Sequence, residues 1–405
     1  MGFRPERLFA ARAHRLQPSE IRQILRLTLR PDVVSFAGGL PDPASFPLEL
    51  IRTLSAQVLD QHGPEALQYG LTMGVPELRE AIAQLMRREG VQTDPEQVIV
   101  TSGSQQGLSL TATLLLEPKD HVIVGSPTYL GLKLLATFHE AIADPVPVDD
   151  EGMDPQAVED LLRRRAQEGT PVKFVYAMPT FQNPSGVTIS SSRRRALVDV
   201  VAAYDTLLVE DDPYSRLRFA GDHQRPLIGY DDEGHVLYLS TFSKLLAPGF
   251  RIGWAQGHPS ILEKFNLTKQ SRDLHTNSFG QYLTAAYLRE GHLDRHVATI
   301  CALYKRKCEA MLLAIDHHFP PEVTVTRPQG GLFTWAVCPP QVDTGVLLPR
   351  AIEQKVAFVT GRSFYTDPGA GANAMRLNFS HPPLERIGPG IERLGGVLRT
   401  AMVAR

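Results

Sequence analysis

Short apolar runs alternate with amphipathic stretches along the first 290 residues of this chain. Runs of this length, bounded by small polar residues, predict buried β-strands, and the stretches between them have the spacing of helices. The predicted strands lie at residues 98–101, 121–125, 172–177, 207–210 and 236–239. Strands that alternate with helices in this way form a mostly parallel sheet with helices on both faces, so the pattern predicts an α/β fold.

The pattern changes after about residue 291. A mixture of helices and short strands replaces the regular alternation, and it predicts a smaller α+β unit. The expected elements are a long helix after residue 291, two strands within 324–337, a helix at 346–354, strands at 356–360 and 374–380, and a helix from Leu384.

The N-terminal residues are expected to join the smaller unit. They contain an amphipathic helix predicted at 19–29 and a short strand predicted at 33–36. We therefore predict a large domain of residues 46–290 and a small domain formed by residues 1–45 and 291–405.

Composition and charge narrow the class of protein. The 405 residues carry a formal net charge of −2, with 43% hydrophobic and 21% charged residues. These values are typical of a soluble globular protein and give no electrostatic reason to expect nucleic acid or an anionic membrane as a partner. The clusters Arg163–Arg165 and Arg193–Arg195 fall within helical patterns, where we expect solvated helix faces.

Cysteine usage and the lack of long apolar runs bear on the compartment. Cys301, Cys308 and Cys338 form no CxxC pair and no spacing typical of a metal site, so no metal is expected. Three cysteines also make a poor disulfide framework, which favours a reducing cytoplasm. We see no apolar core of a secretory signal and no run near the roughly 18 residues of a membrane span. We therefore expect a cytoplasmic protein.

The segment Tyr238–Trp254 carries the first candidate chemistry. A predicted strand ends there in small polar residues, a single lysine, Lys244, and an arginine, Arg251. Apolar neighbours would desolvate the lysine and lower its pKa, and a neutral amine can form an imine with a carbonyl. Thr241, Ser243 and Arg251 offer the donors that a phosphate dianion needs. Taken alone, the segment is explained at least as well by a strand end with an exposed lysine.

Two other strand-to-helix turns carry candidate residues. In SGSQQG, backbone N–H groups at Gly103, Ser104 and Gln105 would lie at a helix N-terminus, where an anion such as phosphate is favoured. The next turn presents Tyr129, whose ring could stack on a flat heteroaromatic cofactor. Each has a plain alternative, because βα turns often contain Gly and Ser for steric reasons and a lone tyrosine is more often packing.

The string around Lys244 resembles the cofactor-lysine segment of pyridoxal-phosphate-dependent aminotransferases with the aspartate-aminotransferase fold, fold type I. Motifs such as SGSQQG, NPSG and MRLNFS follow in the family's order, so the resemblance covers about residues 15–395. It is greatest to the branch of 2-aminoadipate and kynurenine aminotransferases. It implies an enzyme that binds pyridoxal 5'-phosphate on Lys244 and moves an amino group between an amino acid and a 2-oxo acid such as 2-oxoglutarate.

The resemblance implies roles for residues in two other turns. Asp211 would pair with the pyridine nitrogen of the cofactor and keep it protonated. Glu210 and Asp212 are neighbouring alternatives, but the family has this aspartate three residues before a tyrosine, and Asp211 and Tyr214 have that spacing. Asn183 and Tyr214 would donate hydrogen bonds to the phenolate oxygen, and freed Lys244 would move the substrate proton.

Further roles follow from the same resemblance. Arg376 would bind the substrate α-carboxylate, although in isolation it reads as a surface arginine at a strand start. The loop with Gly38 and Gly39 would line the substrate site. Taken alone, the two glycines are explained by a simple turn, by a close approach of the backbone to another group, or by a positive φ. Tyr69 would cross a homodimer interface to the partner's phosphate. The phosphate ligands would be Ser104, Gln105, Thr241, Ser243 and Arg251, and cis peptide bonds are implied before Pro127 and Pro184.

The helix expected at 19–29 offers a candidate for side-chain selection. A fixed arginine left unpaired by an apolar substrate would cost about 1–3 kcal/mol, which a movable cation avoids. The helix resembles the mobile capping helix of the 2-aminoadipate branch. This implies that Arg22 contacts acidic side chains and that substrates include glutamate, 2-aminoadipate and some apolar or aromatic amino acids. A solvated Arg22 is the plain alternative.

Two other functions fit parts of this pattern. A β-lyase, a decarboxylase or a cyclopropane-forming synthase would use the same imine, because substrate orientation decides which bond breaks. The aminotransferase-like effector domain of a DNA-binding regulator fits poorly, because about 18 residues precede the first matched helix and such regulators carry an N-terminal winged helix.

Overall fold

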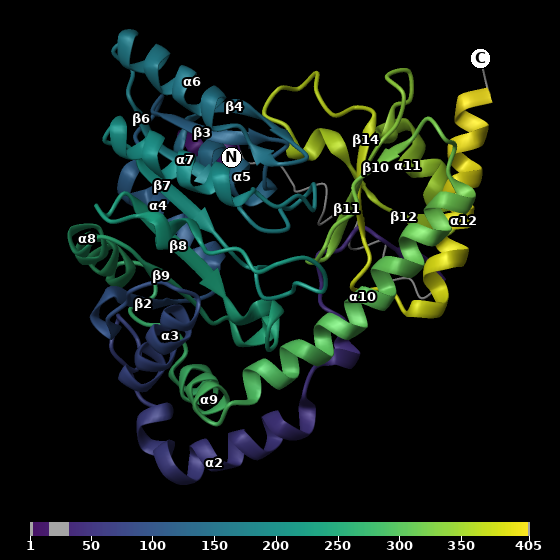
Figure 1. Ribbon diagram of the computed structural model, residues 1–405. Coiled ribbons are helices and arrows are strands. Elements are labelled where there is room, and N and C mark those ends of the chain that lie inside the picture. The colour runs from purple at the N-terminus through teal and green to yellow at the C-terminus, as the bar shows by residue number, and fades with distance from the viewer. Residues whose placement is uncertain (1–2, 16–31, 404–405) are drawn as a thin grey trace.

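The computed structural model describes residues 3–15 and 32–403 (Figure 1). Within these residues, eight strands form the largest sheet, and five consecutive strands at its centre run parallel. Across the sheet, the strands are β2 (Val98–Thr101), β9 (Gly253–Gln256), β8 (Val236–Thr241), β7 (Leu207–Asp211), β6 (Val172–Ala177), β3 (His121–Ser126), β4 (Ile142–Asp149) and β5 (Gly152–Met153). Antiparallel β9 separates β2 from β8, and antiparallel β5 closes the other edge. The predicted α/β fold with a mostly parallel sheet is confirmed.

Both faces of this sheet are buried beneath helices. In β3, Val122 and Val124 pack in one hydrophobic cluster and the intervening Ile123 packs in the other, as alternation along a strand requires. The first face is covered by α4 (Ser104–Leu115), α5 (Leu130–His139) and α8 (Pro259–Gln270). The second face is covered by α3 (Pro76–Arg88), α6 (Pro155–Gln167), α7 (Ser191–Ala203) and α9 (Ser278–Arg289). Burial on both faces explains the continuous apolar runs in the sequence.

A second, antiparallel sheet follows the long helix α10 (His292–His318). Its order is β10 (Thr324–Val325), β11 (Phe333–Val337), β14 (Ala374–Asn378) and β13 (Val359–Thr360). The accompanying helices are α11 (Thr344–Glu353) and α12 (Leu384–Val403), whereas α2 (Leu48–Ala66) packs against α9. Figure 1 shows α10 running from α9, beside the large sheet, to α12, beside the small one. The domain division at residues 46 and 291 stays our proposal.

One predicted strand is wrong. Residues 356–360 form two short strands, because β12 (Val356–Ala357) pairs in parallel with β1 (Val34–Ser35) and β13 pairs with β14. The chain passes from one sheet to the other at Phe358, which is fully buried. An apolar run does not reveal this change of partner, since both strands are buried.

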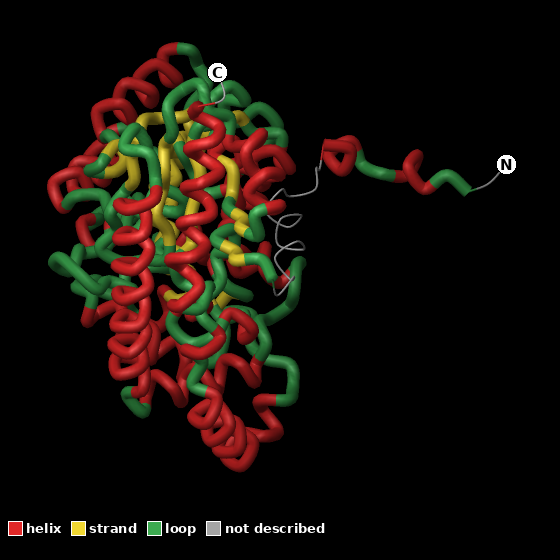
Figure 2. The backbone as a smooth tube through the Cα atoms, turned by 90° about the vertical axis from the view of Figure 1, so that its right-hand side faces the viewer, coloured by secondary structure: helices red, strands yellow, loops and turns green. Residues whose placement is uncertain are grey.

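The N-terminal residues 3–15 project from the body of the molecule (Figure 2). They form the 3-10 turns Pro5–Leu8 and Ala11–Arg15, and the Arg12 guanidinium lies 5.5 Å from the centre of the Phe138 ring on α5. The helix expected at 19–29 lies outside the described residues. Among the helices that are described, we find none whose length and apolar character would let it cross a membrane.

Candidate active site

A pocket of about 640 Å³ lies beyond the carboxyl ends of the parallel strands. Turns that follow β2, β3, β6, β7 and β8 open into it, which is where parallel sheets bind ligands. The sequence-predicted residues that line it are Gly39, Ser104, Gln105, Tyr129, Asn183, Asp211, Tyr214, Thr241, Ser243, Lys244, Arg251 and Arg376. Residues separated by more than 300 positions in the sequence therefore meet in one place.

Lys244 ends a short 3-10 turn at the end of β8. Thr241 caps this turn, because its hydroxyl accepts from the backbone N–H of Ser243 at 3.1 Å. The Lys244 Nζ atom donates to the Gly39 carbonyl at 2.9 Å. Burial, together with the nearby positive charges of Arg251 and Arg376, lowers the pKa of Lys244 to about 8. Roughly a tenth of this amine is therefore neutral and nucleophilic at about pH 7.

An anion-binding surface lies beside Lys244. The Arg251 guanidinium donates to the Ser243 hydroxyl at 3.3 Å and to the Ser102 carbonyl at 3.0 Å, and the hydroxyls of Thr241 and Ser243 are 2.8 Å apart. Gly103 precedes α4 with φ 79°, and a Cβ atom there would lie 2.4 Å from Arg251 Nη2. The helix N-terminus, two hydroxyls and one guanidinium thus face a common space, which suits a dianionic phosphate.

Asp211 ends β7 and is fully buried. Its Oδ2 atom accepts from the hydroxyl of Tyr176 at 2.8 Å, whereas Oδ1 has no hydrogen-bond partner within the part of the chain that the structure describes. Burial raises the pKa of Asp211 to about 7, and the hydrogen bond from Tyr176 acts in the opposite direction. A buried acceptor without a donor costs about 1–3 kcal/mol, so this atom is suited to a ligand that brings a proton.

The neighbouring carboxylates point elsewhere, because side chains alternate along a strand. Glu210 accepts from the backbone N–H groups of Leu227 and Ile228 at 2.8 and 2.9 Å. Asp212 accepts from the hydroxyl of Tyr238 at 3.1 Å and lines a different, smaller cavity. Of these three described carboxylates, Asp211 alone lines the large pocket.

Arg376 lies in the middle of β14 and is 2% exposed, so it is not a surface residue. Its Nη1 donates to Asn183 Oδ1 and its Nη2 to the Ala37 carbonyl, each at 2.7 Å. The guanidinium lies 4.3 Å from the ring centre of Phe333 and 5.1 Å from that of Phe364. Burial lowers the pKa of Arg376 to about 10. A charged, planar donor at the pocket wall suits a carboxylate.

The loop that contains Gly39 is fixed by contacts with α10. The Lys307 amine donates to the Asp42 carboxylate at 2.5 Å, and the Asp42 N–H donates to the Tyr304 hydroxyl at 3.1 Å. Gly39 does not have a positive φ; a Cβ atom there would lie 3.2 Å from the Phe333 ring. Close approach therefore explains this glycine.

The loop that contains Asn183 is anchored by an arginine that we expected to be solvated. Arg194 is 1% exposed and donates to the carbonyls of Ile189 and Pro179, each at 2.9 Å. The expectation of a solvated face is wrong for Arg194, because α7 turns this side chain toward the loop after β6. The cis peptide bonds implied before Pro127 and Pro184 are confirmed.

Comparison with known proteins identifies the family. The family model described as aminotransferase class I and II matches residues 32–394. The chain belongs to this family. Aromatic-amino-acid aminotransferase 1 of Thermococcus litoralis is 42% identical to this aminotransferase over 98% of the chain and 95% of its own length. The resemblance drawn from the sequence is thereby confirmed.

Solved structures of aminotransferases share the fold. The kynurenine aminotransferase of Pyrococcus horikoshii, solved in complex with PMP, has a TM-score of 0.95 and 42% identity, with 98% of each chain covered. LysN, the α-aminoadipate aminotransferase of Thermus thermophilus, was solved with N-(5'-phosphopyridoxyl)-L-leucine. It has a TM-score of 0.92 and 35% identity, with both chains covered completely.

The pocket of this aminotransferase fits the cofactor that its family implies. The buried Oδ1 atom of Asp211 matches a protonated ring nitrogen, and the anion-binding surface beside Arg251 matches a phosphate. Lys244 lines the same pocket and would supply an amine for the cofactor's aldehyde.

Sequence reasoning missed several features of this aminotransferase site. Tyr176 belongs to an apolar run, so the sequence pattern assigned it no role beyond the core. The available signal was that a buried tyrosine hydroxyl usually needs a hydrogen-bond partner. The Met178 sulfur accepts from the Asn183 N–H at 3.1 Å. An apolar wall on α5 was also missed, although its spacing of four residues is helical; it consists of Leu130, Leu134 and Phe138.

One predicted residue, Tyr69, does not contribute to the lining of the pocket. Tyr69 is 78% exposed, and its ring is edge-on to His275 at 5.8 Å between ring centres. Leu67, Leu71 and Leu274 are exposed apolar residues in the same two segments of the chain. Arg22 lies outside the described residues.

Proposed function

We propose that this aminotransferase uses pyridoxal 5'-phosphate to move the amino group of L-amino acids to 2-oxo acids such as 2-oxoglutarate. The observation that carries the proposal is the buried Asp211 Oδ1 atom, which has no hydrogen-bond partner among the described residues and lies in a pocket with Lys244 and Arg251. Relatives named for aromatic amino acids, 2-aminoadipate and kynurenine support acidic and aromatic amino acids as substrates. When bound, the cofactor supplies an aldehyde and an electron-accepting ring.

Each of these pocket residues would have a separate role in the reaction. Lys244, with its lowered pKa, would hold the cofactor and would move the proton that the substrate Cα releases. Asp211 holds a proton at the ring nitrogen, and Asn183 and Tyr214 donate to the ring oxygen. Arg376 binds the α-carboxylate in a fixed orientation, which directs the Cα proton toward Lys244.

Other residues position the ligands. Ser104, Gln105, Thr241, Ser243 and Arg251 bind the phosphate, and Tyr129 packs on the cofactor ring. The backbone at Gly39 and the apolar wall on α5 border the substrate, and Arg22 remains our proposed contact for an acidic side chain. We further propose a cytoplasmic homodimer in which Tyr69 completes the partner's phosphate site.

Borohydride reduction in the presence of pyridoxal 5'-phosphate tests the assignment. We expect the pyridoxyl label on Lys244 after peptide mapping. Lys269 and Lys307 are buried amines as well, at 0% and 1% exposure, but each is held by a carboxylate, Asp273 and Asp42, respectively. A label on either of these lysines, or on none, would contradict the assignment. In a separate sample that has not been reduced, adding glutamate should convert the bound cofactor to its pyridoxamine form, which a lyase or a decarboxylase would not do.

Hybrid dimers of two inactive variants test whether Tyr69 acts in the active site of the partner subunit. Lys244→Ala removes the amine, and Tyr69→Ala removes a phosphate ligand from the partner's site, so neither protein alone should be active at limiting cofactor. In a hybrid dimer, one site combines an intact Lys244 with an intact Tyr69 from the other chain. Random assembly should therefore restore about a quarter of the wild-type sites. No recovery in co-expressed, doubly tagged hybrids, or a fully active monomer in sedimentation, would refute the shared site.

A further inference from the structure

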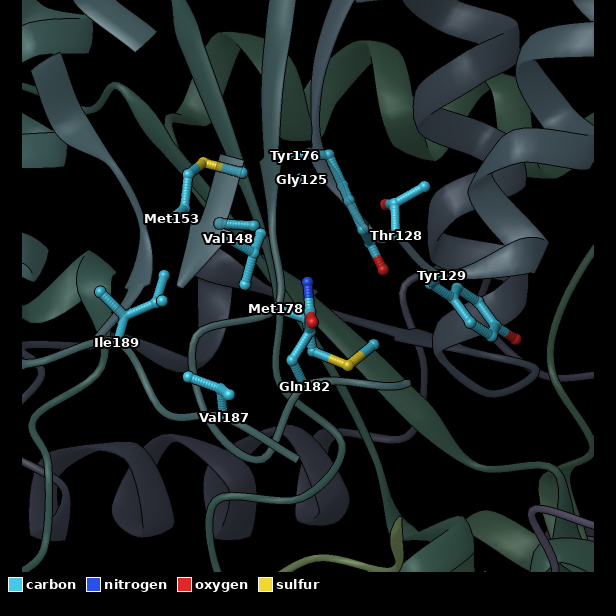
Figure 3. A pocket seen from close by; sticks show the side chains of 12 residues that line it. Gly125, Thr128, Tyr129, Val148, Met153, Tyr176, Met178, Gln182, Val187 and Ile189 are labelled. Carbon is cyan, nitrogen blue, oxygen red and sulfur yellow. The ribbon is translucent and has the colours of Figure 1, made fainter. Parts of the chain in front are cut away.

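Tyr176 is a buried tyrosine that donates a hydrogen bond to a residue of the pocket. It lies near the end of β6 with 2% of its surface exposed, and its hydroxyl donates to Asp211 Oδ2 at 2.8 Å. Figure 3 shows the hydroxyl pointing away from its own strand, on the side where Thr128 and Tyr129 lie. This hydroxyl occupies one oxygen of the carboxylate and leaves the other, Oδ1, available to the large pocket.

The surroundings of Asp211 contain several titratable groups and one described donor. Asp212 follows directly after the end of β7, Tyr129 comes from the turn after β3, and Tyr214 comes from the loop after β7. The negative charge of Asp212 and the burial of the site both favour a protonated Asp211. The hydrogen bond from Tyr176 opposes them, because it favours the ionised form of the carboxyl group.

Water is poorly placed to substitute for this hydroxyl. The cavity beside Tyr176 holds about 10 Å³, at the lower limit for one water molecule. Its lining includes the apolar side chains of Val148, Met153 and Ile189, which offer a water molecule no hydrogen bonds.

We propose that Tyr176 is a positioning residue for Asp211, which turns Oδ1 toward the ring nitrogen of the cofactor and keeps the carboxylate ionised. The inference rests on the proposed function, because Asp211 meets a ring nitrogen only if pyridoxal 5'-phosphate binds in the pocket. Tyr176 itself touches neither cofactor nor substrate in this assignment; it acts through Asp211.

The chain offers a matched control on the neighbouring strand. Tyr238 of β8 is also buried, and its hydroxyl donates to Asp212 Oδ2 at 3.1 Å. Tyr176→Phe and Tyr238→Phe therefore each remove one buried hydroxyl from one of two adjacent carboxylates. The signs of their effects on Asp211 differ. Loss of the Tyr238 hydroxyl favours a protonated Asp212, which weakens the repulsion that Asp212 exerts on Asp211.

The decisive measurement is the dissociation constant of pyridoxal 5'-phosphate as a function of pH. For Tyr176→Phe, we expect the ratio of its Kd to the wild-type Kd to be about tenfold or more at about pH 6, and to fall toward one by about pH 9. The ratio falls because Asp211 is ionised at high pH in the variant as well as in the wild type. For Tyr238→Phe, we expect a ratio within about twofold of one throughout this range. Thermal melting of the two variants checks that both fold.

A second readout reports on the ring directly. With ¹⁵N-labelled cofactor, the ring-nitrogen resonance should be that of a protonated nitrogen in the wild type and in Tyr238→Phe. It should move toward the unprotonated position in Tyr176→Phe. A loss of packing alone would move neither this resonance nor the pH dependence of the Kd ratio.

The outcomes separate the two proposals. If the wild type takes the borohydride label on Lys244 but the Kd ratio for Tyr176→Phe is independent of pH, the role of Tyr176 is refuted and the proposed function stands. Equal effects of the two variants would also refute it. If the wild type takes no label on Lys244, the proposed function fails and the role of Tyr176 fails with it.

Discussion

Replacing Lys244 with alanine is expected to lower the rate of amino-group transfer by at least about a thousandfold. A positioned acid–base group contributes about 10²–10⁴ to a rate, and Lys244 also holds the cofactor. The amine lies in the pocket lining together with Asp211 and Arg376, so no exposed lysine can replace it. Single-turnover absorbance measurements with glutamate give the rate. Small primary amines added to the solution should restore part of it.

A buried lysine elsewhere controls for the loss of a buried amine. Lys269 is fully buried, donates to Asp273 and does not belong to the described lining of the pocket. Lys269→Met should lower the melting temperature, yet the folded protein should retain a rate within about tenfold of the wild type, with no rescue by amines. A Lys244→Ala protein whose rate is also within tenfold would refute the role of Lys244.

Replacing Arg376 with lysine is expected to raise the KM for the amino acid by about 30-fold to several thousandfold. Removing one partner of a buried, hydrogen-bonded charge pair costs about 2–5 kcal/mol, and lysine cannot reproduce the planar fork. The change leaves Asp211 and the anion-binding surface intact, so the Kd of pyridoxal 5'-phosphate should change little. Because burial lowers the pKa of a lysine, the variant's KM should rise further as the pH increases through that pKa.

Arg218 provides the matched control for Arg376. Its guanidinium lies 4.6 Å from the ring centre of Phe181, much as Arg376 lies over Phe333, but it does not contribute to the described pocket lining. Arg218→Lys should affect thermal stability and leave KM unchanged. Equal changes in KM for the two variants, or a normal KM for Arg376→Lys, would remove Arg376 from substrate binding.

Local patterns in the sequence predicted the parts of the site that a strand and its following turn determine. The turns at Ser104, Asp211 and Lys244 were found because apolar runs end there in polar residues. Alternation along β7 also explains why Asp211 differs from Glu210 and Asp212.

The parts that depend on distant segments could not be predicted locally. The contact between Arg376 and Asn183 joins residues 193 positions apart, and only the folded arrangement of two sheets brings them together. The sequence could not distinguish Arg194 from a solvated arginine of an amphipathic helix. Its acceptors are backbone carbonyls of a loop, which every residue type has, so no side chain in the sequence indicates them. Tyr176 could not be distinguished from a core residue, because its strand is apolar on both faces and the sequence does not indicate that its hydroxyl meets Asp211.

The anchoring of the Gly39 loop on α10 has a consequence for engineering. This loop gives its Gly39 carbonyl to Lys244 and its Ala37 carbonyl to Arg376, so any redesign that displaces α10 disturbs both side chains together. Rate and carboxylate recognition therefore cannot be tuned independently from that side of the molecule. The apolar wall on α5 borders the same pocket without sharing these two contacts. Libraries that aim to broaden or narrow the range of side chains should therefore diversify α5 and leave α10 and its loop unchanged.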